Sequence, residues 1–142
     1  MAMPATQIKT AIVAHLRGVC GGFTLPIPQE QIRGLLDVSG TPRDAYGIVV
    51  TCEDLGDHFG NTGGVLVDVR PSITIYTHIN EDEDGALCDA LASDVLGAMQ
   101  TIAYSLDGWL VAWNGSWTAA DTTMDGSYRQ IALSATLPLN RI

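Results

Sequence analysis

The stretch from Asn80 to Leu91, NEDEDGALCDAL, is the part of the chain most suggestive of metal chemistry. Asn80, Asp82 and Asp84 occupy every second position, and Gly85 follows where a calcium-binding loop makes its sharp turn. The twelfth position of such a loop requires a bidentate Glu, but Leu91 stands there. We therefore interpret the acidic residues as the start of a helix, where carboxylates meet free backbone N–H groups and the positive end of the helix dipole. No metal site is expected.

Histidines, cysteines and glycine-rich segments suggest no second chemical site. His15, His58 and His78 share no metal-ligand spacing, and although His78 could pair with Asp82, no nucleophile stands beside them. The stretch GNTGG at 60–64 lacks the lysine of a phosphate-binding loop, so it is interpreted as a hairpin tip. The three cysteines form no CxxC pair, which favours reduced thiols over a zinc site or a disulfide framework. The sequence therefore predicts neither an enzyme nor a cofactor.

Three tryptophans recur at a spacing of four residues, at Trp109, Trp113 and Trp117. Helical spacing is one interpretation, but the flanking glycines and the β-branched middle favour a strand with Trp109 and Trp113 on one face. The rings could stack on a ligand. Packing in a core or an interface is the favoured role.

The composition bounds the class of protein. The chain has 142 residues, 46% of them apolar, and its 7 basic and 16 acidic residues give a formal net charge of −9. A field of that sign repels DNA and anionic membranes, although DNA could still pass such a surface without sticking to it. No segment resembles a signal peptide or a membrane span. A single domain over 1–142 is expected.

Periodicity predicts an α+β fold with an antiparallel sheet, a long central strand or hairpin, and two main helices packed on one face. Helices are expected over 5–19 and about 84–104, and an ordered proline-rich connector over about 23–47. Strands are expected over the ranges 47–53, 65–79, 109–113 and 128–139, with a loop over 56–64 and a polar loop over 114–127.

The segment from Val65 to Ile79 alternates without a break in parity, with apolar residues at nearly all odd positions and mostly polar ones at even positions. Such a strand spans roughly 50 Å, longer than most single small domains need. Pro71 cannot donate to a ladder, so it marks an edge, a bulge or a break between two strands. The far end of the strand is expected to pair with, or lie on, another chain.

The order of elements resembles the tail terminator (tail completion) proteins of long-tailed bacteriophages, which belong to a group of small α+β ring proteins at the head–tail joint. The segments VLVDVRPSITIYTHI, NEDEDGALCDALASDVLGAM and YRQIALSATLPL carry this resemblance, which covers the chain from about residue 5 to its end. The resemblance implies a virion protein that forms a homo-oligomeric ring, expected to be hexameric. This ring would cap the tail tube, end its growth and join the tail to the head.

The partners implied are a tail-tube protein and a head-side connector or stopper protein, with DNA passing through the ring unbound and no membrane involved. The location implied is the tail or neck of a virion assembled in the host cytoplasm. Candidate contact residues lie on the polar face of the long strand and near the closing strand: Asp68, Arg70, Tyr76, His78, Trp117 and Arg129.

Two other functions stay open. The chain could be a head-side adaptor or a tail-tube subunit of the same machine. It could instead be a small ligand-binding or metabolic enzyme domain with a pocket between the sheet and the second helix, near Tyr76, His78 and Trp109.

Overall fold

The computed structural model describes residues 3–34, 45–59, 65–111 and 117–141. Within these ranges, two helices and eight strands make up an α+β fold, as expected from periodicity. The helices are α1 (Pro4–Val19) and α2 (Ala86–Met99), with short 3-10 turns η1 (Cys20–Gly22) and η2 (Gln29–Gln31). The strands are β1 (Ile32–Arg33), β2 (Tyr46–Phe59), β3 (Val65–His78), β4 (Trp109–Val111), β5 (Thr118–Ala119), β6 (Thr123–Asp125), β7 (Tyr128–Ser134) and β8 (Leu137–Arg141).

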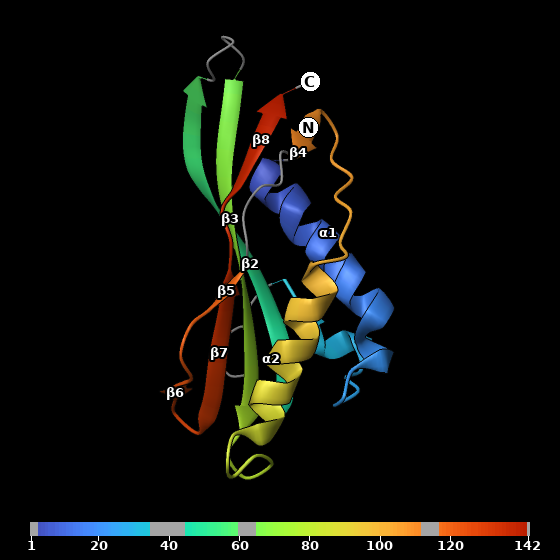
Figure 1. Ribbon diagram of the computed structural model, residues 1–142, viewed down its shortest axis with the longest axis vertical. Coiled ribbons are helices and arrows are strands. Elements are labelled where there is room, and N and C mark those ends of the chain that lie inside the picture. Colours follow the sequence, from blue (N-terminus) through green and yellow to red (C-terminus); the bar gives the residue numbers. More distant parts are fainter. Residues whose placement is uncertain (1–2, 35–44, 60–64, 112–116, 142) are drawn as a thin grey trace.

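Strand β3 is the centre of the sheet, and both helices cover the same face (Figure 1). On one side β3 pairs antiparallel with β2, from Thr77 opposite Tyr46 to Val65 opposite Phe59. On its other side β7 and β8 lie end to end along it. The sheet is mostly antiparallel, the exception being β1, which pairs parallel to β2.

Pro71 lies where the partner of β3 changes. Pairing with β7 ends at Ser72, and pairing with β8 begins at Val69. The carbonyl oxygen of Pro71 accepts a bond from Ala135 N at 3.4 Å, so its backbone points toward the junction of β7 and β8. Pro71 thus lacks an N–H at the point where β3 changes from pairing with β7 to pairing with β8, so little pairing is lost. The break lies in the partner strand, whereas β3 is continuous.

The predicted alternation of β3 is confirmed. Its odd-numbered residues from Val67 to Thr77 are buried against the helices, and they share a core with apolar stripes on α1 and α2. The stripe of α1 consists of Ala5, Ile8, Ile12 and Leu16. Ile131 and Leu133 on β7, Leu137 on β8 and Ala135 between these strands are all buried in this core, as expected for the single face that the sequence predicted.

Several predicted boundaries were wrong. β2 runs on to Phe59, through a stretch whose composition suggested a loop, because β3 supplies a pairing partner over the whole length and a bulge with Gly56 at φ 100° absorbs the irregular residue. The second helix ends at Met99 rather than near 104, and the closing strand is divided in two. The polar loop contains β5 and β6, which are edge strands on β7.

The described part of the connector is ordered and packs on the core. Phe23, Ile27 and Ile32 are each buried, and the chain passes through η2 into β1. The remainder of the connector, 35–44, lies outside the described residues.

Candidate interaction surface

The face of the sheet away from the helices carries the even-numbered side chains of β3. Asp68, Ser72 and Thr74 are half-buried and Arg70 is exposed, so this face is polar in its middle. Glu53 on β2 lies opposite Arg70 in the ladder, and opposite charges on neighbouring strands stabilise such a pair. We refer to the even-numbered residues from Asp68 to His78, with their neighbours on β2 and β7, as the open face.

An aromatic cluster occupies one end of the open face. Tyr76 and Tyr128 meet edge to face with ring centroids 5.7 Å apart, and His78 meets Tyr128 in the same way at 5.0 Å. His78 Nδ1 also accepts a bond from Asn80 N at 3.1 Å. Tyr76 is only 3% exposed. The predicted contact residues Tyr76 and His78 are therefore brought together, with Tyr128 as a third member that sequence reasoning missed.

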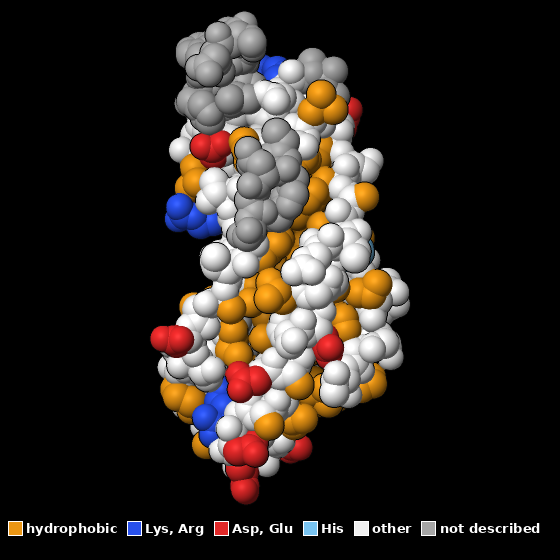
Figure 2. Space-filling model, viewed as in Figure 1, with side chains coloured by type: hydrophobic (Ala, Val, Ile, Leu, Met, Phe, Trp, Pro, Cys, Tyr) orange, Lys and Arg blue, Asp and Glu red, His pale blue; other side chains and the backbone are white. Residues whose placement is uncertain are grey.

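The acidic segment before α2 is a helix start, as interpreted from the sequence. Asp82 is buried, and its carboxylate accepts bonds from Thr77 Oγ1 at 2.8 Å, Leu87 N at 3.0 Å and Cys88 N at 2.9 Å. Burial alone would raise the pKa of Asp82, but the bonds from Thr77, Cys88 and Leu87 outweigh it, and its pKa is lowered. The carboxylate of Asp82 thus serves to stabilise the start of α2. The other acidic side chains near it gather at the same end of the molecule (Figure 2).

Arg129 holds the same helix start from β7. Its Nε donates to the carbonyl oxygen of Asp82 at 2.9 Å, and its guanidinium also bonds to the carbonyl oxygen of Glu83. The side chain of this predicted contact residue thus fastens the loop before α2 to the sheet. Its role toward a partner stays a prediction.

The two tryptophans among the described residues, Trp109 and Trp117, are both buried in the core. Trp117, a predicted contact residue, is 8% exposed and belongs to the core of this chain. Trp109 is buried beneath the guanidinium of Arg141, whose carbon lies 5.0 Å from the ring centroid. Trp113 lies outside the described residues. Because Tyr76 and His78 face the opposite side of the sheet from Trp109, the ligand pocket suggested near these three residues is not formed.

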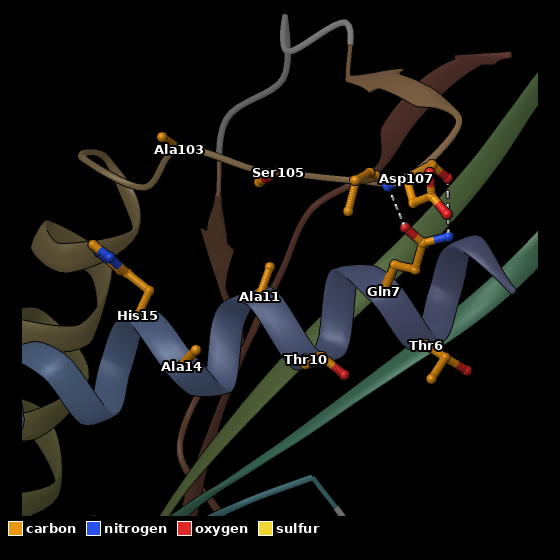
Figure 3. A pocket seen from close by; sticks show the side chains of 10 residues that line it. Thr6, Gln7, Thr10, Ala11, Ala14, His15, Ala103, Ser105 and Asp107 are labelled. Atoms are coloured by element: carbon orange, nitrogen blue, oxygen red, sulfur yellow. Dashed lines mark hydrogen bonds between the residues drawn. The ribbon is translucent and has the colours of Figure 1, made fainter. Parts of the chain in front are cut away.

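A groove of about 840 Å³ runs between α1 and the segment 103–107 (Figure 3). Gln7 and Asp107 bond to each other across it, from Asp107 N to Gln7 Oε1 at 2.8 Å and from Gln7 Nε2 to the Asp107 carbonyl oxygen at 3.3 Å. His15 Nε2 lies 2.9 Å from the carbonyl oxygen of Ala98, so this histidine ties α1 to α2. Most other lining side chains are small, and the groove presents no paired acid and base beside a nucleophile.

Cys52, Cys88 and Tyr104 are not activated by their surroundings. Burial and the nearby Asp54 raise the pKa of Cys52 to about 12, and burial raises the pKa of Cys88 and of Tyr104. A thiol with a raised pKa is protonated and a poor nucleophile at neutral pH. Within the described ranges, no group of three or more His, Cys, Asp or Glu residues could hold a metal ion. No helix in the described part of the chain is long and apolar enough to cross a membrane.

Comparison with known proteins shows the fold. No protein-family model matches the sequence, and no curated protein matches it. A solved chain from the virion of a native gene transfer agent particle is 15% identical and superimposes with a TM-score of 0.68, over 98% of this chain and 99% of that chain. A second solved structure is 11% identical, with a TM-score of 0.60 over 97% of this chain and 96% of its own. At such identities the two share the fold with this protein, along nearly their whole lengths.

Proposed function

We propose that this protein is a structural component of a phage-like virion whose copies form a ring on the end of the tail tube, stop its growth and join the tail to the head. The observation that carries the proposal is the match, nearly end to end on both chains, to a chain of a gene transfer agent virion. Fold alone is a poor warrant for function, so the chemistry of the surface must agree.

The surface chemistry supports a role in contact rather than catalysis. The open face offers the exposed Arg70 and the half-buried rings of His78 and Tyr128 on paired strands, which suits recognition of another protein. The net charge of −9 opposes binding of DNA, and a conduit benefits from repulsion because a sticking duplex would stall. The groove between α2 and β7, of about 340 Å³ and lined by residues such as Ala92, Leu96 and Ile131, offers a second surface of apolar character. Apolar side chains are visible along this side of the molecule (Figure 2).

The partners proposed are further copies of this chain, the tail-tube protein and a head-side connector or stopper. The decisive experiment deletes the gene from the phage or phage-like element that encodes it and images the lysate by negative stain. We expect filled heads without tails, and free tails of irregular or excessive length. Complementation with the wild-type gene should restore joined particles.

Other outcomes of this experiment separate the alternatives. Complete absence of tails would indicate a tail-tube subunit. Tails of normal length beside unjoined heads would indicate a head-side adaptor. Normal joined particles in the deletion strain would overturn a role in virion assembly altogether.

A further inference from the structure

We infer that copies of this chain join edge to edge, with the outer edge of β2 in one copy pairing antiparallel with the outer edge of β4 in the next. This inference rests on the proposed function only in taking the second copy as the partner. It names the two surfaces that a ring of identical subunits requires, which must differ from each other in a heterologous contact.

The sheet has two edges at the level of the β2–β3 hairpin. Four strands lie side by side there, in the order β2, β3, β8 and β4. One row of the ladder runs through Asp57, Val67, Leu139 and Val111. Among the described residues, β1 pairs with β2 only at Ile48 and Val49, and β4 pairs only with β8. No strand of the described residues therefore lies beside the outer edge of β2 or of β4 at this level.

The backbone groups on these two edges point outward at matching positions. Residues of an antiparallel pair alternate between bonding to each other and bonding away from each other. The backbone carbonyl of Pro71 bonds toward the side of β7 and β8. Val67 is an even number of residues away, so its backbone groups point to the same side. Asp57 lies opposite Val67 and therefore points its N–H and C=O away from β3. By the same alternation Val111, opposite Leu139, points its groups away from β8.

The strand directions allow this pairing between copies in the same orientation. β2 is antiparallel to β3, whereas β4 is antiparallel to β8, which is itself antiparallel to β3. β2 and β4 therefore run in opposite directions. A second copy placed alongside by rotation, without being turned over, brings its β4 antiparallel to β2 of the first.

Side chains on the two edges favour this contact over pairing of β2 with a second β2. β2 carries the exposed carboxylates of Glu53 and Asp54 beside a bulge, a combination that discourages pairing with an identical edge. β4 has no charged residue, and Arg141 lies next to it on β8. Each edge also exposes a leucine, Leu55 at 39% and Leu110 at 60%, which pairing would cover. Joined in this way, the open faces of successive copies become one continuous polar surface.

Cysteine cross-linking tests the contact directly. In a Cys52→Ser background, Leu55→Cys and Leu110→Cys are made singly and together, and each protein is treated with a short bismaleimide at micromolar concentration. We expect a ladder of covalent oligomers beyond the dimer for the double variant, and none for either single variant. The control pair is Leu110→Cys with Met124→Cys, because Met124 is 53% exposed but lies on β6, at the other end of the sheet. A ladder of equal strength from the control pair, or dimers from Leu55→Cys alone, would overturn the assignment.

A second comparison removes one outward N–H from the edge of β2. Asp57→Pro should weaken self-association by about tenfold relative to Asp57→Ala in sedimentation velocity, because the proline cannot donate to the neighbouring β4. Thermal melting of both variants checks that the fold persists, since proline is tolerated on an edge where the N–H faces outward. Equal association of the two variants, or a wild-type protein that stays monomeric, would also overturn edge pairing.

The two proposals fail separately. If the protein associates through another surface and its gene restores joined particles to the deletion strain, the edge pairing is wrong and the proposed function stands. If it pairs through β2 and β4 but deletion of its gene leaves joined particles, the edge pairing stands and the proposed function is wrong.

Discussion

Tyr76 lies across Gly47, its direct partner on the neighbouring strand, so closely that a Cβ on Gly47 would come within 2.5 Å of the tyrosine hydroxyl. The same Cβ would meet the carbonyl oxygen of Gln31 at 2.8 Å. The glycine gives the ring room to lie on the backbone, and the ring covers the strand where the side chain is missing. This explains why a tyrosine on the open face is buried.

Replacing Gly47 by alanine should therefore destabilise the protein by about 1–3 kcal/mol, because the ring and the backbone of Gln31 must both move to accommodate a methyl group. Urea unfolding followed by circular dichroism measures the change. Gly97→Ala is the matched control. A Cβ there meets nothing within 4 Å and Gly97 lies in the last turn of α2, so this variant should gain stability, by less than the about 0.5–1 kcal/mol of a mid-helix position. Equal effects at the two positions would contradict the tight contact.

Asp82→Ala should cost about 1–3 kcal/mol at neutral pH, since it removes the acceptor of three bonds at the start of α2. Asp84→Ala removes a single bond, which Ala86 N donates to the exposed Asp84 carboxylate, and should cost less than half as much. Unfolding free energies of the three proteins at pH 7 measure this difference.

The pH dependence of the unfolding free energy tests whether the charge of Asp82 causes this stabilisation. Its pKa is lower in the folded state than the usual value of 3.8, so the unfolded chain binds the proton more readily. Its contribution is fully present above 3.8 and is lost as the pH falls through the folded-state pKa. The wild type should therefore lose more stability than Asp82→Ala on acidification below that value. Parallel curves for the two proteins would rule out this role.

Arg129→Ala should destabilise the protein by about 1–3 kcal/mol, because the guanidinium bonds to the carbonyl oxygens of Asp82 and Glu83 in the loop before α2. Arg129→Lys keeps the charge but not the fork of donors, so it should recover less than half of the loss. Hydrogen exchange of the first turn of α2 should accelerate in both variants. Arg70→Ala, at an exposed position, should stay within about 0.5 kcal/mol of wild type.

Arg70→Gln should impair assembly while leaving stability within about 0.5 kcal/mol of wild type, since Arg70 is exposed on the open face. Complementation of the deletion strain, scored as the fraction of heads joined to tails, measures assembly. Gln100→Glu is the control, because it changes the net charge by the same amount at an exposed position directly after α2. If both variants complement equally well, the open face around Arg70 is not a contact surface.

Local sequence determined the elements whose signals repeat along the chain. The alternation of β3 and the apolar stripe of α1 were readable because each face meets a different environment at a fixed period. The acidic start of α2 was readable in the same way, because carboxylates satisfy free N–H groups wherever a helix begins. The α+β class follows from these elements and their order alone.

Tertiary structure alone decided what each element pairs with. The composition of residues 56–59 suggests a loop, yet they form a strand because β3 lies alongside them. Tyr128 joins Tyr76 and His78 only through the register of β7 on β3, and Trp109 is parted from them because β4 places it on the opposite face. Which charges and edges become neighbours depends on contacts between residues far apart in the chain. The periodicity of one segment does not indicate which distant residues that segment contacts. The open face and the outer edges of β2 and β4 could therefore be identified only in the folded molecule.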